Sequence, residues 1–338
     1  MSGNHRKCYF AEKLIVYKSL EICAGAGGQA LGLEQAGFKH VALVEIEPVA
    51  CKTMLRNRPN WNVIEADIRS FSAKAYKGID LFAGGVPCQP FSHGGQQLGK
   101  EDERDLFPEA LRLIKECKPK AVMLENVRGL LDEVFEDYRQ HIISFLEQEG
   151  YKCDWRLVNS SDYGVSQLRP RAILIALKRK YFGYFEWPKK LQKTPISVGD
   201  LLYDEMASLG WENANNWRKQ ANGIAPTLVG GSKKHGGADL GPTRAKKAWS
   251  LLGVDGHGLA DQPPINGSMA MPRLTLKMTA LLQGFPKDWE FIGKKTPAYR
   301  QVGNAFPPPV AKAIGTSIKK ALSKYEQGQK RKRLQNKA

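Results

Sequence analysis

The pattern of apolar and polar positions divides the chain into two parts of different character. In the first half, compact apolar runs alternate with segments whose apolar residues have helical spacing. Such runs are typical of buried strands, and apolar positions three or four residues apart are typical of helices. The predicted strands are residues 17–23, 41–46, 79–83, 121–124 and 172–177, and the predicted helices are residues 30–36, 48–56, 106–117 and 135–149.

This alternation predicts an α/β fold with a doubly wound parallel sheet and helices on both faces. After about Lys178 the pattern changes. Residues 181–271 are rich in Gly, Trp, Asn and Pro and lack long helical periodicity, which predicts a loop-rich lobe with short strands. Helical periodicity returns at 276–282 and 310–322. We expect the basic run 330–333 to be a solvated end that can touch phosphates, rather than a folded element.

Charge adds a statement about partners. Lys and Arg number 51 against 34 Asp and Glu, so the formal net charge is +17. An excess of this size favours a polyanionic partner through phosphate neutralisation. A generally basic surface without such a partner gives the same balance. Charge alone does not distinguish DNA from RNA or from an acidic membrane face.

Cysteine usage and hydropathy narrow the class of protein further. None of the six cysteines lies in a C-x-x-C pair, so we expect free thiols in a reducing compartment and no metal site. No N-terminal apolar stretch is long enough for a signal peptide or a membrane span. We therefore expect a cytoplasmic, nucleoid-associated protein that has no contact with membranes.

Two features predict a nucleoside site at the carboxyl ends of the first strands. The glycine-rich sequence A-G-A-G-G at 24–28 follows a predicted strand and leads into a predicted helix, so its backbone can approach a cofactor closely. Glu45 and Asp67 end successive strands, where one carboxylate can accept ribose hydroxyls and the other an adenine amino group. A plain strand-to-helix turn and solvated carboxylates are the alternatives.

Three further motifs carry candidate chemistry. Cys88 lies in a loop after a predicted strand, framed by Pro87 and Pro90, and its thiolate would be a nucleophile. Glu125 lies at the end of the next strand, where apolar surroundings favour the protonated form of its carboxyl group. A helix-capping or surface carboxylate is an equally good interpretation. Arg169 and Arg171 can neutralise phosphate or charge that develops on a base carbonyl, and ordinary surface arginines are the alternative reading.

The order and spacing of these motifs resemble the DNA (cytosine-5)-methyltransferase family, of the bacterial restriction–modification type. The resemblance extends over nearly the whole chain: A-G-A-G-G, P-C-Q-P-F-S at 87–92, E-N-V at 125–127, Q-L-R-P-R at 167–171, L-Q-G-F-P at 282–286 and Q-V-G-N-A at 301–305. It implies a Rossmann-like S-adenosylmethionine-dependent methyltransferase fold with a smaller, loop-rich target-recognition domain. The implied domains are residues 1–178 (catalytic, cofactor-binding), 179–272 (target recognition) and 273–338 (a C-terminal segment returning to the catalytic domain).

The resemblance also implies the roles of individual residues. Cys88 would attack carbon 6 of a cytosine flipped out of duplex DNA, Glu125 would protonate N3, and Arg171 and Arg169 would contact the base and its surroundings. The residues implied to hold S-adenosyl-L-methionine are Ala24, Gly25, Gly27, Gly28, Glu45, Ile46, Asp67, Ile68, Leu106 and Asn304. The residues expected to contact DNA are Gln89 and Ser92 beside the nucleophile, and Lys233, Lys234 and Arg244 in and after a glycine-flanked basic loop.

Two positions depart from the family pattern, and two other readings stay open. Cys23 stands where family members usually carry a Phe whose ring packs against the cofactor, and Glu21 stands where Asp is more usual. The alternatives are a tRNA cytosine-5 methyltransferase of the same architecture and a DNA-binding relative without catalysis. The expected partners are double-stranded DNA and a cognate restriction endonuclease, and the expected state is a monomer. The basic loop could instead touch phosphates only.

Overall fold

A computed structural model describes residues 16–87, 105–230 and 237–336. Its centre is a seven-stranded sheet in the order β3-β2-β1-β4-β5-β7-β6. The strands are β1 (Tyr17–Ile22), β2 (Phe38–Glu45), β3 (Val63–Glu65), β4 (Leu81–Gly85), β5 (Ala121–Val127), β6 (Tyr151–Asn159) and β7 (Pro170–Lys178). Neighbouring strands from β3 to β5 are parallel, whereas β7 is antiparallel to both β5 and β6. The α/β prediction is therefore confirmed.

The prediction of a wholly parallel sheet is wrong at one edge. After β6 the chain turns back through a short 3-10 helix, Ser160–Tyr163, and inserts β7 between β5 and β6. The five predicted strands are all present, but β3 and β6 have no counterpart in the prediction. β3 has only three residues and β6 carries charged side chains such as Lys152 and Arg156, so neither forms a compact apolar run. Edge strands bury less of their surface, which explains the weak signal.

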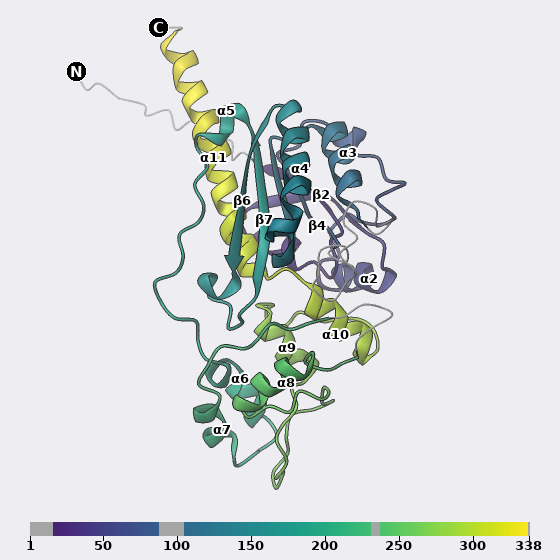
Figure 1. The fold of residues 1–338 in the computed structure, drawn as a ribbon, viewed down its shortest axis with the longest axis vertical. Helices are drawn as coiled ribbons and strands as arrows, with labels where there is room; N and C mark the ends of the chain where they lie inside the picture. The colour runs from purple at the N-terminus through teal and green to yellow at the C-terminus, as the bar shows by residue number, and fades with distance from the viewer. Residues whose placement is uncertain (1–15, 88–104, 231–236, 337–338) are drawn as a thin grey trace, which may run out of the picture.

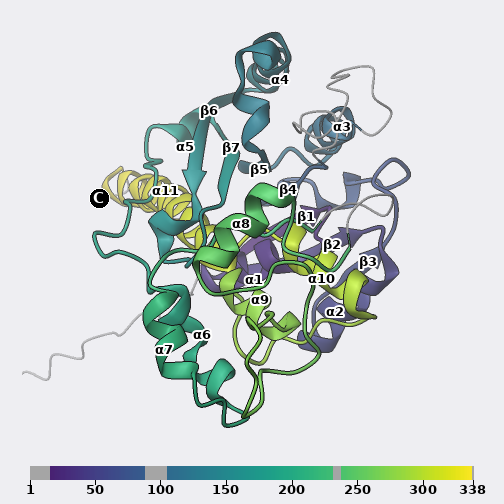
Figure 2. The same cartoon turned by 60° about the horizontal axis from the view of Figure 1, so that its bottom comes forward.

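Helices cover both faces of the sheet, as Figure 2 shows. Helices α3 (Phe107–Cys117) and α4 (Glu136–Gln148) share one apolar cluster with alternate residues of the strands. Helix α1 (Gly28–Gln35) and the long helix α11 (Pro308–Gln335) share a second cluster on the opposite face. Helix α2 (Pro48–Asn57) connects β2 to β3. Because β1 ends at Ile22 and α1 begins at Gly28, the glycine-rich turn between them lies at the carboxyl end of β1.

Helix α11 corrects the expectation for the basic run 330–333. The run forms the last turns of this 28-residue helix instead of an unfolded end, although its side chains are exposed. Lys, Arg, Gln, Glu and Leu, the main residues after 323, are strong helix formers, and no proline interrupts them. Helical propensity thus continues α11 beyond the part that packs on the sheet.

The second part of the chain forms a lobe at one end of the sheet domain (Figure 1). After α5 (Arg179–Phe182), its helices are α6 (Val198–Ala207), α7 (Ala214–Gln220) and α8 (Thr243–Leu251), followed by α9 (Leu276–Leu282) and α10 (Lys295–Asn304). Between 181 and 271 the described residues form no named strand and only isolated bridges, such as the one between Gly210 and Ile265. The expectation of short strands there is wrong. Helices of seven to ten residues give too little periodicity to detect.

Large aromatic side chains give the lobe an apolar cluster of its own. Trp211, Trp217 and Trp249 are buried in it together with leucines of α6. Helix α9 contributes Met278 to the same cluster. The expected boundary after residue 272 therefore runs through a shared core, and the division into three domains stays a prediction. No described helix combines the length and apolar character that a membrane span requires.

A buried polar cluster joins the lobe to the sheet domain. Arg169, which is fully buried, donates from its two terminal nitrogens to the carbonyl oxygens of Leu228 and Gly303, each at 2.8 Å. Gln167 donates to Gln283 Oε1 at 2.7 Å and accepts from the Leu228 amide at 2.9 Å. The segment that leads into β7 thus fixes both the lobe and the end of α10.

We predict that Arg169→Leu lowers the free energy of unfolding by about 3–5 kcal/mol, because two buried carbonyl groups lose a charged donor. Chemical denaturation followed by circular dichroism measures this. Arg331→Leu, at the exposed end of α11, is the control and should change the same quantity by less than about 0.5 kcal/mol. Equal effects of the two substitutions would contradict the structural role of Arg169.

A second prediction concerns the contact between α1 and α11. A Cβ added at Gly32 would lie 2.3 Å from the Pro308 carbonyl oxygen and 2.5 Å from Ala311 Cβ. We expect Gly32→Ala to destabilise the fold by about 1–3 kcal/mol, because backbone must move to admit the methyl group. Gly328→Ala in α11, where nothing lies within 4 Å, should instead stabilise by about 0.5–1 kcal/mol. Thermal unfolding of both variants measures the difference.

Candidate active site

A cavity of about 670 Å³ lies beyond the carboxyl ends of β1, β2, β4 and β5. Its size is typical of small-molecule sites. The glycine-rich turn, the ends of the strands and the segment at the end of α10 line it. Eleven of the expected site residues line this one cavity. Nine are expected cofactor ligands, Ala24, Gly25, Gly28, Glu45, Ile46, Asp67, Ile68, Leu106 and Asn304, and the other two are Glu125 and Arg171 at the opposite end.

The glycine-rich turn has a backbone that its sequence explains. Gly25 (φ 54°) and Gly27 (φ 85°) are in the left-handed region, and Gly25 has open space where a side chain would project. Gly28 is required by a close approach, because a Cβ there would lie 2.4 Å from the Phe306 carbonyl oxygen. Gly27 does not line the cavity: it caps α1 and packs near Trp61. Gly27 thus shapes the turn without facing the space that a ligand would fill.

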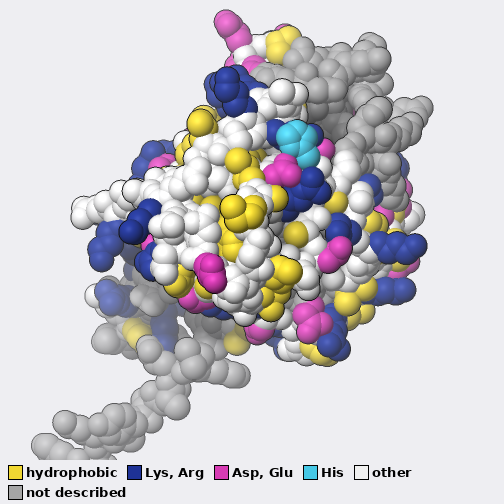
Figure 3. All heavy atoms as spheres, turned by 90° about the horizontal axis from the view of Figure 1, so that it is seen from below, with side chains coloured by type: hydrophobic (Ala, Val, Ile, Leu, Met, Phe, Trp, Pro, Cys, Tyr) yellow, Lys and Arg dark blue, Asp and Glu magenta, His cyan; other side chains and the backbone are white. Residues whose placement is uncertain are grey.

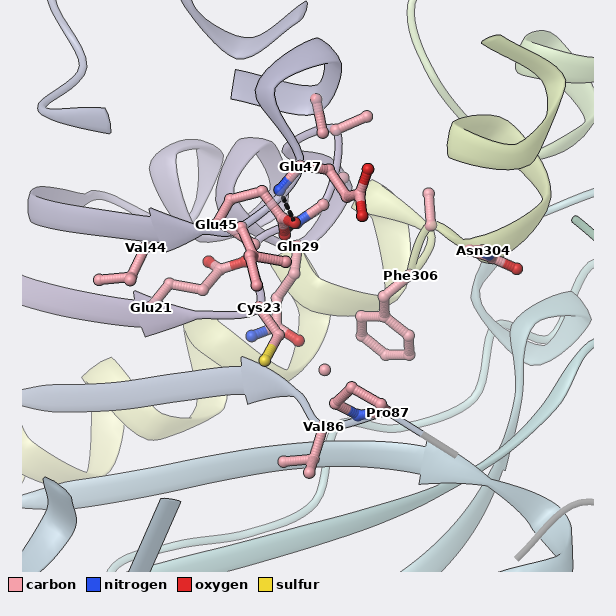
Figure 4. A pocket seen from close by; sticks show the side chains of 18 of the residues that line it. Glu21, Cys23, Gln29, Val44, Glu45, Glu47, Val86, Pro87, Asn304 and Phe306 are labelled. Atoms are coloured by element: carbon pink, nitrogen blue, oxygen red, sulfur yellow. Dashed lines mark hydrogen bonds between the residues drawn. The ribbon is translucent and has the colours of Figure 1, made fainter. Parts of the chain in front are cut away.

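Glu45 is held rigidly at the end of β2. Its Oε2 accepts the Gly25 amide at 2.7 Å and its Oε1 accepts the Glu47 amide at 2.9 Å (Figure 4). Burial raises the pKa of this carboxyl, and the backbone hydrogen bonds oppose that rise. Each oxygen keeps a further lone pair. Glu45 therefore ties the glycine-rich turn to the second strand and still has acceptor capacity toward the cavity.

Asp67 lies after β3, at a more open part of the cavity wall. Its Oδ1 accepts the Arg69 amide at 2.9 Å, and its Oδ2 pairs with the Arg69 guanidinium at 3.0 Å. The backbone hydrogen bond from Arg69 is the main reason that the pKa of Asp67 is lowered. Ile68, beside it, is buried. The cavity thus has a charged acceptor next to an apolar wall at this end.

Strand register brings the candidate catalytic motifs together at the other end. In the sheet, Glu125 of β5 pairs with Gly85 of β4, and Val127 pairs with Arg171 of β7. The Arg171 Nε lies 2.8 Å from Glu125 Oε1, and about one-eighth of each side chain is exposed. Asn126, which directly follows Glu125, is buried and donates a hydrogen bond to the Val86 carbonyl oxygen at 3.3 Å. The ion pair therefore lies beside the segment that leads to residue 88.

Several expected site residues cannot be placed. Cys88, Gln89 and Ser92, and Lys233 and Lys234, lie outside the described residues. Pro87, which directly precedes the expected nucleophile, is described and lines the cavity. Arg244 is described and lies exposed in the first turn of α8, away from the cavity lining.

Arg169 is not where the sequence interpretation expects it. A contact with a base requires an accessible guanidinium, but Arg169 has no exposed surface, does not line the cavity and holds two backbone carbonyl groups. In one extended strand, the side chains of residues 169 and 171 would point the same way. However, β7 begins only at Pro170, so Arg169 lies outside the strand and its side chain takes a different direction. Only Arg171 of the two reaches the cavity.

The cavity contains further residues that the motifs did not identify as ligands. Gln29 is buried at the start of α1, and neither of its amide atoms has a hydrogen-bond partner among the described residues. Glu21 Oε2 is buried and unpartnered in the same way, and burial, followed by the charge of Glu45, raises the pKa of Glu21 well above its usual range. Phe306 contributes a ring. Gln29 directly follows the A-G-A-G-G motif and Phe306 directly follows Q-V-G-N-A, so their positions in the sequence could have identified both as candidate lining residues.

The fold is shared with solved methyltransferases. The Entamoeba histolytica methyltransferase EhMeth superposes with a TM-score of 0.64 at 15% sequence identity, covering 91% of this chain and 99% of that one. The S. pombe Dnmt2 methyltransferase gives a TM-score of 0.59 at 17% identity, covering 91% and 98% of the two chains. At these identities the likeness concerns the fold alone.

Two bacterial relatives are much more similar in sequence. The Type II methyltransferase M.NgoMIV of Neisseria gonorrhoeae is 56% identical over 317 residues, which cover 91% of this chain and 99% of the relative. The Type II methyltransferase M.NaeI of Lentzea aerocolonigenes is 53% identical over 318 residues, covering 92% and 77%. A sequence model of the C-5 cytosine-specific DNA methylases matches residues 17–320. The chain therefore belongs to the C-5 cytosine-specific DNA methylase family.

Proposed function

We propose that this chain transfers the methyl group of S-adenosyl-L-methionine to carbon 5 of a cytosine in a specific duplex DNA site, with Cys88 as the covalent nucleophile. The observation that carries the proposal is the single cavity that joins Glu45 and Asp67 at one end to the Glu125–Arg171 pair at the other. A reaction between a nucleoside cofactor and a base needs both sites to be continuous, because the two reacting carbons must meet.

The residues of the cavity fit this cofactor. Glu45 has acceptor capacity for ribose hydroxyls, Asp67 can accept from an adenine amino group, and Ile68 offers an apolar wall to the base. The buried, unpartnered amide of Gln29 needs a polar ligand to satisfy it. Asn304 closes the cavity from the C-terminal side. When bound, the cofactor supplies an electrophilic methyl group.

Cytosine carbon 5 is a poor nucleophile, and the protein's own groups would overcome this. The Cys88 thiolate adds to carbon 6, and Glu125 donates a proton to N3, so that negative charge does not accumulate on the ring. Arg171, paired to Glu125 at 2.8 Å, orients that carboxyl. After carbon 5 has been methylated, the carbon 5 proton is lost to solvent, the Cys88 thiolate is expelled and the N3 proton returns to Glu125, which restores the aromatic ring and the starting state of the enzyme.

None of these contacts is possible with a base stacked in a duplex, so the cytosine must flip into the cavity. Flipping costs a few kcal/mol, as for the methyltransferases among the known base-flipping enzymes. We assign the task of binding and reading DNA to residues 179–272, between a catalytic domain of residues 1–178 and a returning segment of residues 273–338. Gln89, Ser92, Lys233, Lys234 and Arg244 are the proposed DNA contacts. On the lobe's end face, Lys and Arg side chains are scattered among apolar and acidic ones (Figure 3), which suits dispersed phosphate contacts.

The names of the similar bacterial enzymes support a role in a restriction–modification system. Relatives that match nearly the full chain are Type II methyltransferases. We propose that this enzyme protects DNA from a cognate restriction endonuclease, and that it acts as a monomer in the cytoplasm, in association with the nucleoid.

We predict that duplex DNA containing 5-fluorocytosine traps the enzyme in the presence of S-adenosylmethionine. Fluorine at carbon 5 cannot leave as a proton does, so the bond to Cys88 persists and a denaturing gel shows a protein–DNA adduct. Cys88→Ser should bind DNA and cofactor but form no adduct and transfer no methyl group. Cys153→Ser removes a thiol that does not line the cavity and is the matched control. Methyl transfer by Cys88→Ser would contradict the covalent mechanism, and trapping on tRNA instead of duplex DNA would contradict the proposed substrate.

We also predict that Glu125→Gln lowers kcat by about 100-fold or more, with a much smaller change in the Kd for DNA. Glutamine keeps the size and the hydrogen-bonding shape of the side chain but cannot deliver a proton to N3. Single-turnover kinetics with labelled cofactor and fluorescence anisotropy measure the two quantities. Glu133→Gln, an exposed surface substitution, is the control. Parallel losses in catalysis and DNA binding would make Glu125 a structural residue.

A further inference from the structure

The cavity has one aromatic wall within the part of the chain that the structure describes. Of the described lining residues, only Phe306 has an aromatic ring. It follows α10 and precedes α11, so it comes from the opposite end of the chain to the glycine-rich turn. On the turn itself, the corresponding lining positions carry small or polar side chains, including Cys23 and Gln29.

Phe306 is held firmly in place. Only 5% of the residue is exposed. Its carbonyl oxygen packs so closely on Gly28 that a Cβ added there would lie 2.4 Å from it. Three prolines, 307–309, follow it directly, and the first turn of α11, which begins at Pro308, packs on Gly32. Proline fixes the backbone φ angle, so the segment has little freedom. The ring is therefore a preorganised part of the wall.

The ring projects into the cavity near the site of the chemistry. Figure 4 shows Phe306 between Asn304 and Pro87, on the side of the cavity that faces Cys23. Pro87 directly precedes Cys88. If Cys88 attacks the base, the methyl donor must react within a few ångströms of this segment. On the function proposed above, the reacting part of the cofactor would therefore lie beside Phe306, and its nucleoside part would lie toward Asp67 and Glu45.

Cys23 cannot provide an aromatic contact from the opposite wall. It has a left-handed backbone (φ 49°), which is uncommon for a residue with a side chain, and its sulfur points into the cavity region shown in Figure 4. Burial raises the pKa of this thiol, so it stays uncharged. A neutral, small side chain there leaves the ring of Phe306 as the polarisable surface available to a cation.

We propose, on the basis of the function proposed above, that the Phe306 ring contacts the cofactor's sulfonium through a cation–π interaction and so favours the charged cofactor over its neutral, demethylated product. The ring face carries partial negative charge and attracts a cation most strongly where water is excluded. After methyl transfer the sulfur is an uncharged thioether, so the attraction disappears. Phe306 would therefore determine selectivity and assist product release.

Isothermal titration with S-adenosylmethionine and S-adenosylhomocysteine tests this directly on the full chain. The measured quantity is the ratio of the two Kd values. We expect Phe306→Leu to reduce the preference for S-adenosylmethionine by about 5- to 30-fold, the size expected of a desolvated cation–π contact. Ile68→Ala is the matched control. It removes apolar contact at the nucleoside end, so it should weaken both ligands by the same factor and leave the ratio unchanged.

Fluorinated phenylalanines at position 306 keep the test valid if Phe306→Leu does not fold. Successive fluorination removes negative charge from the ring face with little change of shape, so the preference should fall stepwise. An equal loss for both ligands in Phe306→Leu, or a ratio insensitive to fluorination, would overturn the inference and leave Phe306 as an apolar wall. Failure of the unmodified protein to bind either ligand would instead overturn the proposed function.

Discussion

The hydrogen-bonded register of β5 between β4 and β7 is the constraint on which the site depends. Pairing with β4 places Glu125 beside Gly85, and pairing with β7 places Arg171 beside Val127. Because side chains alternate along a strand, a slip of one residue would turn Glu125 away from the cavity. Asn126 secures the same register from the side chain, through its hydrogen bond to Val86. Three motifs that lie 40 residues or more apart in sequence thus meet through backbone geometry.

A second constraint is the close approach of the C-terminal segment to the first helix. Gly28 faces the Phe306 carbonyl group, and Gly32 faces Pro308 and Ala311, at separations that admit no side chain. A similar contact exists between Gly303 and Gly230, next to Asn304. These contacts allow residues from both ends of the chain to enclose one cavity. They also link the cavity wall to the lobe, since Gly230 belongs to the segment that Arg169 holds through Leu228.

Several buried polar groups of the cavity have no hydrogen-bond partner among the described residues. Glu21 and Gln29 are buried with atoms that have no partner among the described residues, and burial raises the pKa of Glu21 and Glu45. Buried polar groups without partners reduce stability. A ligand that supplies hydrogen bonds and positive charge would offset this cost. The strained backbone of Cys23 in the same turn is consistent with a site built for binding rather than for stability.

The sequence by itself determined the fold class, the family and the main polar groups at the two ends of the cavity. Compact apolar runs identified the central strands because these strands are buried on both faces, and the glycines and carboxylates that follow the runs indicated the site. The sequence could not determine the edge strands β3 and β6 or the short helices of the lobe, since their side chains are half-exposed or their segments too short for periodicity. It could not determine the direction of β7 either, because that direction depends on pairing with the undetected strand β6. Tertiary structure alone separated Arg171, which reaches the cavity, from Arg169, which holds the lobe in place. It alone brought Phe306 against the glycine-rich turn, because a contact between residues nearly 280 positions apart depends on how two distant helices pack.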